Sequence, residues 1–240
     1  MMTRARARYV HEQERINSLL DLYIHNAIEL DHAVRQKTKL QRSQQDTATT
    51  PPKELYLGAG ATRKIASSRF YDLMAEMSLC RLVDNYLCYV TDLLSLLFRS
   101  RPECLRSSET VTLDFVLGHK TTPRLIRAIA DRQVNKLAYQ GMKDLNDYTT
   151  KRLGLPLFID DPDFVLAIEV VEMRNLIVHA RGKVNEIFLS RTKSTQHEFG
   201  HQLSFSFASV RQRGNLLDRS VEDLEHRAHS KFGFAMPVPQ

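Results

Sequence analysis

The sequence predicts a mainly all-α protein, a bundle of four to five helices with an N-terminal helical extension. Across most of its 240 residues, apolar side chains recur at i, i+3, i+4 and i+7, which places them on one face of a helix. The sequence contains no internal repeat and no Gly-rich phosphate loop. Only residues 109–117 and 202–207 alternate in the manner of strands, so we expect a short strand or hairpin element there.

The most informative stretch is residues 161–188, DPDFVLAIEVVEMRNLIVHARGKVNEIF. Asp161 or Asp163 is expected to cap a helix, with Pro162 in its first turn. Nothing breaks the helical pattern as far as Ala180, and Gly182 is a natural stop just beyond it. Apolar side chains occupy nearly its whole circumference, which predicts a helix buried on all sides.

The polar exceptions in this helix are therefore the residues to explain. Glu172, Asn175 and His179 share one sector because residues three and four apart are neighbours on a helix. Arg174 lies about 140° around the helix from His179, so the two side chains do not face each other within one copy. A buried guanidinium needs a partner, and a second copy of the helix about a two-fold axis is a candidate for it.

The run RNLIVH, Arg174 to His179, resembles the Arg-polar-x-x-x-His motif of HEPN-domain ribonucleases. The continuation HARGKVNEIF, from His179 to Phe188, is similar to the tail of that motif, and the match covers roughly residues 158–188. The resemblance implies a HEPN-like helical bundle that forms a homodimer and cuts single-stranded RNA at a composite site. It also implies a toxin or antiviral defence role, with an antitoxin such as a nucleotidyltransferase-like protein as a possible partner.

The residue types suit that chemistry. The 2′-hydroxyl of RNA attacks the adjacent phosphate, which requires a proton acceptor, a proton donor and positive charge on the phosphorane. His179 is expected to move protons near neutral pH and Arg174 to grip phosphate oxygens. By the resemblance, Asn175 orients the histidine or the phosphate, and Arg181 and Lys183 hold flanking phosphates. This reaction needs no metal and no cofactor.

Other interpretations stay open. In a purely structural one, Arg174 pairs with Glu172 or Glu169 while His179 caps its own helix C-terminus. Some HEPN relatives are catalytically silent and use the bundle only for dimerisation or partner binding.

A zinc hydrolase is a further alternative, because the run HEFGH places His197 and His201 at the spacing of a zinc-protease motif around Glu198. The polar residues before it and the strand-like run after it do not match that motif's setting.

The division of the chain follows from its composition. Residues 1–60 are predicted to be an N-terminal helix, from about residue 9 to 39, plus a polar linker, and residues 61–235 to be the HEPN-like domain. Within that domain we expect helices over residues 62–100, 124–148 and 209–231. A net charge of +6 permits RNA as a partner.

Three scattered cysteines indicate no disulfide framework. No secretory signal opens the chain, and its longest apolar run is too short to span a bilayer, so we expect a cytoplasmic protein without membrane contact.

Overall fold

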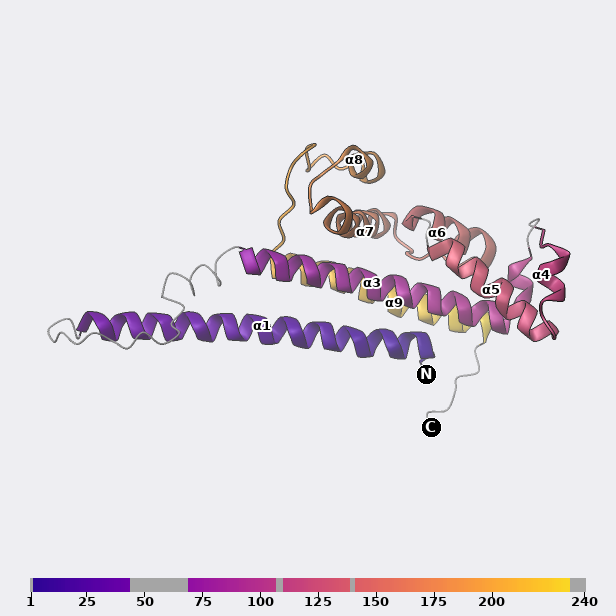
Figure 1. Ribbon diagram of the computed structural model, residues 1–240, viewed down its shortest axis with the longest axis horizontal. Helices are drawn as coiled ribbons and strands as arrows, with labels where there is room; N and C mark the ends of the chain where they lie inside the picture. Colours follow the sequence, from indigo (N-terminus) through magenta and orange to yellow (C-terminus); the bar gives the residue numbers. More distant parts are fainter. Residues whose placement is uncertain (1, 44–68, 107–109, 139–140, 234–240) are drawn as a thin grey trace.

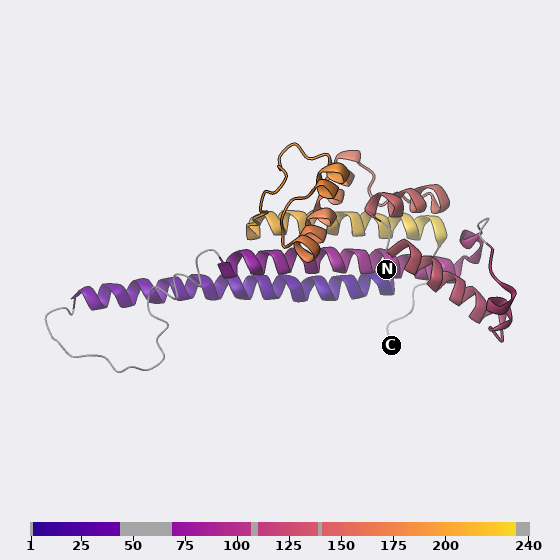
Figure 2. The same ribbon diagram turned by 45° about the horizontal axis from the view of Figure 1, so that its top comes forward.

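The computed structural model is all-α, as the sequence predicts, over the residues that it describes: 2–43, 69–106, 110–138 and 141–233. Three long helices, α1 (Arg4–Ser43), α3 (Arg69–Ser100) and α9 (Phe207–Phe232), run along the long axis of the molecule (Figure 1). The second half of α1 extends past the start of α3 (Figure 2). The shorter elements are η1 (Pro102–Leu105), α4 (Leu113–Leu117), α5 (Thr122–Ala138), α6 (Met142–Tyr148), η2 (Thr149–Leu153), α7 (Asp161–Ala180) and α8 (Glu186–Thr192).

Helix α3 is the centre of the fold because it contacts α1, α5, α7, α9 and η1. Its apolar residues follow helical spacing around most of the circumference, so each neighbouring helix receives part of the core. The buried side chains of α3 include Ala75, Leu79, Leu82, Val83, Tyr86, Tyr89, Val90, Leu93, Leu94, Leu97 and Phe98. Helix α9 comes close to α3 at Gly214, where an added Cβ would lie 3.3 Å from a methyl carbon of Leu82.

Two hydrogen bonds of Tyr9, one buried and one partly buried, attach the first half of α1 to this core. The hydroxyl of Tyr9 donates to the carboxylate of Asp218 on α9. On the other side, the amide of Asn85 on α3 donates to the backbone oxygen of Tyr9, at 3.1 Å. Burial, followed by the charge of Asp218, raises the pKa of the Tyr9 phenol well above its usual value, so the phenol stays a proton donor.

A buried carboxylate on α9 joins the same three helices. Glu225 on α9 is only 3% exposed and accepts three hydrogen bonds. Two come from Thr3, whose backbone N–H and hydroxyl lie 2.6 and 2.9 Å from the carboxylate oxygens, and one comes from the hydroxyl of Tyr89, at 3.1 Å. Because a buried charge without partners is costly, these donors hold α1 and α3 in one position against α9.

The prediction of a short strand or hairpin element at residues 109–117 and 202–207 is wrong. In place of a strand within 109–117, Leu113–Leu117 forms helix α4, which begins where the hydroxyl of Thr112 accepts a hydrogen bond from the backbone N–H of Phe115. Among the described residues, the 202–207 segment pairs only through an isolated antiparallel bridge between Gln202 and Lys183. Helix α9 then starts at Phe207, capped by the side chain of Ser206.

The predicted helix over 124–148 is two helices in the structure. Helix α5 ends at Ala138, and α6 begins at Met142 after Gly141, which has an extended backbone conformation. The predicted boundary near residue 60 lies outside the described residues. Within the described residues, no helix is long and apolar enough to cross a membrane.

We expect Tyr9→Phe to lower the free energy of unfolding by about 1–3 kcal/mol, because Asp218 loses a hydrogen-bond donor in a partly buried site. Urea denaturation followed by circular dichroism measures the loss. Tyr23→Phe is the matched control, because the Tyr23 ring also packs against the core but its hydroxyl has no hydrogen-bond partner among the described residues. Equal effects of the two substitutions would contradict a specific role for the Tyr9 hydroxyl.

Candidate functional site

Helix α7 forms with Pro162 in its first turn, as predicted, but the expected cap is wrong: the N-cap residue is Asp160, and no side chain caps the helix start, because Asp161 and Asp163 already lie inside the first turn. Its burial is also uneven. The middle turns are buried at Ala167, Val170, Val171, Glu172, Met173 and Leu176. Both ends are open: Val165 and Leu166 are 54% and 49% exposed, and Val178 is 51% exposed. The prediction of burial on all sides is therefore correct for the middle and wrong for the ends, because α3, α8 and α9 cover only part of its length.

Arg174 forms an ion pair with Asp84 of α3, 2.8 Å between the nearest nitrogen and oxygen. The pair is partly open to solvent, since the two side chains are 25% and 36% exposed. Arg174 also donates to the side-chain oxygen of Asn175 at 3.2 Å, while its Nε is buried with no hydrogen-bond partner. The expected pairing with Glu172 or Glu169 is absent, because the guanidinium points to the neighbouring helix.

Glu172 anchors a second charged contact, with α8. Its side chain is 7% exposed and accepts two hydrogen bonds, of 3.0 and 3.3 Å, from the guanidinium of Arg191. The amide of Asn175 also reaches Glu172, at 3.4 Å. Asn175 therefore links the two ion pairs into one chain, Asp84–Arg174–Asn175–Glu172–Arg191, that crosses α7 from α3 to α8.

His179 lies in the last turn of α7 with its side chain exposed. No described residue hydrogen-bonds to its imidazole, so the exposed ring is accessible to a ligand. The helix end is capped without it, because the backbone N–H groups of Arg181 and Gly182 both donate to the carbonyl of Leu176. The expected role of His179 as a cap for its own helix is therefore not what the structure shows.

Arg181 and Lys183 follow directly and are both exposed. Arg181 adopts a left-handed backbone conformation, with φ of 54°, and its carbonyl accepts a hydrogen bond of 2.8 Å from the side chain of Gln202. Lys183 forms the bridge with Gln202. The loop after α7 is thus held by the segment before α9, with two cationic side chains directed to solvent beside His179.

The face of α3 below this site carries Glu76, Cys80 and Asp84 at i, i+4 spacing. Burial, and secondarily the charge of Asp72, raises the pKa of Glu76. Burial raises the pKa of Cys80 to about 11, Asp84 adds to the shift, and Arg174 opposes it. Cys80 is therefore a thiol at neutral pH, not a nucleophilic thiolate.

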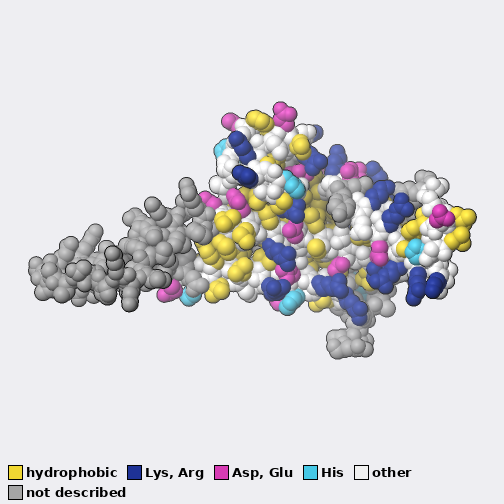
Figure 3. Space-filling view, in the orientation of Figure 1, with side chains coloured by type: hydrophobic (Ala, Val, Ile, Leu, Met, Phe, Trp, Pro, Cys, Tyr) yellow, Lys and Arg dark blue, Asp and Glu magenta, His cyan; other side chains and the backbone are white. Residues whose placement is uncertain are grey.

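Apolar side chains are exposed on the same face. Leu73 and Met77 of α3 are 49% and 57% exposed, and Leu19 and Leu22 of α1 are 54% and 57% exposed. In the space-filling view, hydrophobic side chains gather over the start of α3, beside a column of basic, acidic and histidine side chains that runs toward α7 (Figure 3). We call the four exposed residues on α1 and α3 the apolar face.

The HEFGH segment, residues 197–201, is not helical, so its two histidines do not lie on one helix face as in a zinc-protease motif. Instead, the Nε2 of His197 lies 3.4 Å from the carboxylate of Glu169 on α7, and its ring centroid is 6.5 Å from that of His201. Among the described residues, no group of three or more His, Cys, Asp and Glu side chains is arranged to hold a metal ion.

The site thus brings Arg174 and Asn175 into one hydrogen-bonded chain and leaves His179, Arg181 and Lys183 exposed at the helix end. No family model, curated protein or solved structure matches this chain. A function must therefore be argued from the side chains themselves. Sequence reasoning missed Asp84 and Arg191, the two ends of the linked ion pairs that cross α7. They lie on other helices, and no local spacing relates them to the RNLIVH run.

We expect Arg191→Ala to lower the free energy of unfolding by about 2 kcal/mol, because it leaves the buried carboxylate of Glu172 without its cation. Glu172→Gln is expected to cost less, about 1 kcal/mol, since the exposed Arg191 regains water. The matched control is Arg211→Ala: Arg211 is also 53% exposed, but its partner Asp21 is 63% exposed, so the loss should stay below about 0.5 kcal/mol. Urea denaturation measures all three variants, and equal losses for Arg191→Ala and Arg211→Ala would contradict the role of burial.

Proposed function

We propose that this chain is a metal-independent endoribonuclease of the HEPN type, which acts on single-stranded RNA as a homodimer with a composite site. The observation that carries the proposal is the arrangement at the end of α7. Arg174, two exposed cations and His179, whose imidazole has no hydrogen-bond partner among the described residues, occur within ten positions of one helix and its loop.

The chemistry assigned to these groups is proton transfer and charge stabilisation. His179 takes the proton of the 2′-hydroxyl, or gives a proton to the 5′-oxygen that leaves, and an exposed imidazole is suited to both. As the 2′-oxygen bonds to phosphorus, the P–O5′ bond breaks, leaving a 2′,3′-cyclic phosphate and a 5′-hydroxyl. Arg174 binds the negatively charged phosphorane, for which its partly exposed guanidinium has to exchange Asp84 for phosphate oxygens.

A second copy of the chain completes the site in this proposal. Within one straight helix, Arg174 and His179 point about 140° apart, so one scissile phosphate does not meet both from the same α7. The apolar face and Val178 expose hydrophobic side chains on α1, α3 and the last turns of α7, and surfaces of this kind in soluble proteins mark association sites. Two-fold pairing through this surface brings the arginine of one copy toward the histidine of the other.

The toxin or antiviral defence role, and an antitoxin of the nucleotidyltransferase type, belong to the same proposal through the resemblance of the RNLIVH run. Arg181 and Lys183 are assigned to flanking phosphates, because their exposed side chains follow His179 directly along the chain.

Purified protein is expected to cut single-stranded RNA in the presence of EDTA and to leave 2′,3′-cyclic phosphate and 5′-hydroxyl ends. Arg174→Ala and His179→Ala should each lower the cleavage rate by about 100-fold or more, because each removes a group needed in the transition state. Electrophoresis of labelled RNA gives the rate, and enzymatic end-group analysis gives the chemistry.

Two variants serve as matched controls for this experiment. His229 is a histidine exposed in the last turn of α9, and Arg99 is an arginine paired with Asp131 at 2.9 Å, away from α7. His229→Ala and Arg99→Ala should cut at the wild-type rate. Cleavage that survives both α7 substitutions, or ends that carry a 3′-hydroxyl, would reject the assignment.

A second candidate function is a catalytically silent module for dimerisation or partner binding. The Arg174–Asp84 ion pair is the observation that favours it, since an arginine held by a carboxylate serves a structural role without any substrate. The two candidates differ in one result. A stable dimer or complex that shows no cleavage of any single-stranded RNA supports the binding module.

Met77→Glu is expected to convert the proposed dimer into a folded monomer, because it places a charge in the apolar face, where Met77 is already 57% exposed and tolerates polar replacement in the monomer. Analytical ultracentrifugation measures the mass, and Leu117→Glu is the control, because Leu117 is 72% exposed on α4. RNA cleavage should fall together with the dimer. A wild-type protein that is monomeric at micromolar concentration would contradict the composite site.

A further inference from the structure

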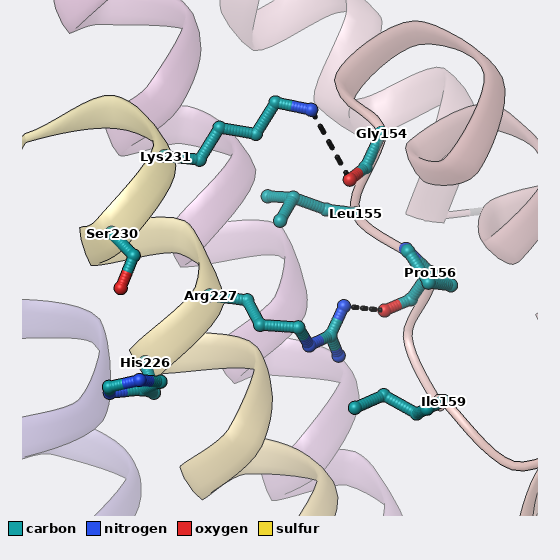
Figure 4. Close-up of a pocket in the computed structure, with 8 residues that line it drawn as sticks. All are labelled: Gly154, Leu155, Pro156, Ile159, His226, Arg227, Ser230 and Lys231. Carbon is teal, nitrogen blue, oxygen red and sulfur yellow. Dashed lines mark hydrogen bonds between the residues drawn. The ribbon is translucent and has the colours of Figure 1, made fainter.

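A pocket of about 530 Å³ lies at the other end of α7, between the last turns of α9 and the loop of residues 154–159 that leads into α7 (Figure 4). Its size falls within the range of roughly 300–1,000 Å³ that small-molecule sites occupy. The lining residues are Gly154, Leu155, Pro156 and Ile159 from the loop, and His226, Arg227, Ser230 and Lys231 from α9. None of these eight residues is acidic. The pocket lining is therefore positively charged, unlike the linked ion pairs around Arg174, where acidic and basic side chains alternate.

Two long cationic side chains reach from α9 across to the loop (Figure 4). Arg227 donates to the carbonyl of Pro156 at 2.7 Å and is paired with Asp223 at 2.8 Å, so its charge is balanced and it holds the wall in place. Lys231 donates to the carbonyl of Gly154 at 3.3 Å. No carboxylate among the described residues pairs with Lys231, and an ammonium has three donors, so its charge and further donors remain available to an anion.

Gly154 makes room for that ammonium. Its backbone is left-handed, with φ of 57°, and a Cβ added there would lie 2.3 Å from the Lys231 nitrogen. A side chain at position 154 therefore conflicts both with the backbone conformation and with the position of the lysine. With glycine at this position, the Lys231 ammonium lies directly against the loop backbone, and it also lies 5.9 Å from the centroid of the Phe232 ring.

The loop side of the pocket is apolar. Leu155 and Pro156 lie between and beside the two cationic side chains, and Ile159 lies below Arg227 (Figure 4). Ile159 is 63% exposed, although the neighbouring Leu157 and Phe158 are buried. An exposed aliphatic side chain and an ammonium that pairs with no carboxylate among the described residues thus line one cavity, which offers hydrophobic contact at one end and anion binding at the other.

We propose that this pocket binds a nucleotide, with its phosphate on Lys231 and its base against the apolar wall that Pro156 and Ile159 present over the buried Leu155. A phosphate alone leaves the apolar wall uncovered, and a nucleoside alone leaves the ammonium without an anion, whereas a nucleoside monophosphate matches both. The site does not depend on the proposed ribonuclease activity, since it lies before the first turn of α7 and His179 lies in the last.

The test is titration of the full chain with AMP, adenosine and inorganic phosphate, followed by calorimetry. AMP should bind at least about tenfold more tightly than either of the other two, because only AMP makes both contacts. Lys231→Met should weaken AMP binding by about tenfold or more, and Gly154→Ala should also weaken it by displacing the ammonium. Lys143→Met, at an exposed lysine of α6 outside the pocket, should bind AMP as the wild type does.

Ile159→Ser separates the two halves of the site, since it should weaken AMP binding severalfold and leave phosphate binding unchanged. Circular dichroism confirms that each variant is folded, and Ile159 is exposed enough for the change to be tolerated. Equal affinity for AMP and inorganic phosphate, AMP affinity unchanged in Lys231→Met, or no saturable AMP binding at millimolar concentration would each overturn the proposal. His179→Ala should bind AMP normally, so failure of the ribonuclease proposal and failure of this one are distinguishable.

Discussion

The fold depends on one constraint: helix α3 is covered by neighbours on most of its surface, and its polar groups must be satisfied by those same neighbours. Tyr9 and Glu225 show how this is done, because their hydrogen bonds join α1, α3 and α9 through groups that are costly to bury alone. Apolar packing tolerates small shifts of one helix along another, whereas these hydrogen bonds form at only one relative position of the helices. The face of α3 that remains open, with Met77 and Asp84, is therefore held in a defined position.

The charged chain across α7 shows how the same residues serve structure and, in our proposal, chemistry. Glu172 is buried and tied to Arg191, so it fixes the rotation of α7 and the position of α8. Arg174 is less buried, and its partner Asp84 is open to solvent, so this ion pair can exchange partners at a lower cost. A phosphate that displaces Asp84 uses a guanidinium already oriented by Asn175.

The two ends of α7 have different charge environments. At its C-terminal end, His179, Arg181 and Lys183 are exposed, and our proposal assigns this surface to a second copy of the chain and to RNA. At its N-terminal end, Lys231, which pairs with no carboxylate among the described residues, lines a pocket together with apolar loop residues, and we propose a small anionic ligand there. The buried middle of the helix separates the two surfaces, so each can be altered without disturbing the other.

The sequence by itself determined the helical class, the start and end of α7 and the residues around RNLIVH, because helical periodicity, Pro162 and Gly182 act over a few neighbouring positions. It did not determine α4, since the residues around Phe115 alternate between polar and apolar as in a strand. The helix is favoured by the cap at Thr112, which the alternation does not reveal. Only the tertiary structure decided that Arg174 pairs with Asp84 and Glu172 with Arg191, and that Lys231 stands over Gly154. Those partners lie on separate helices, and the packing of whole helices, not local spacing, brings their side chains together.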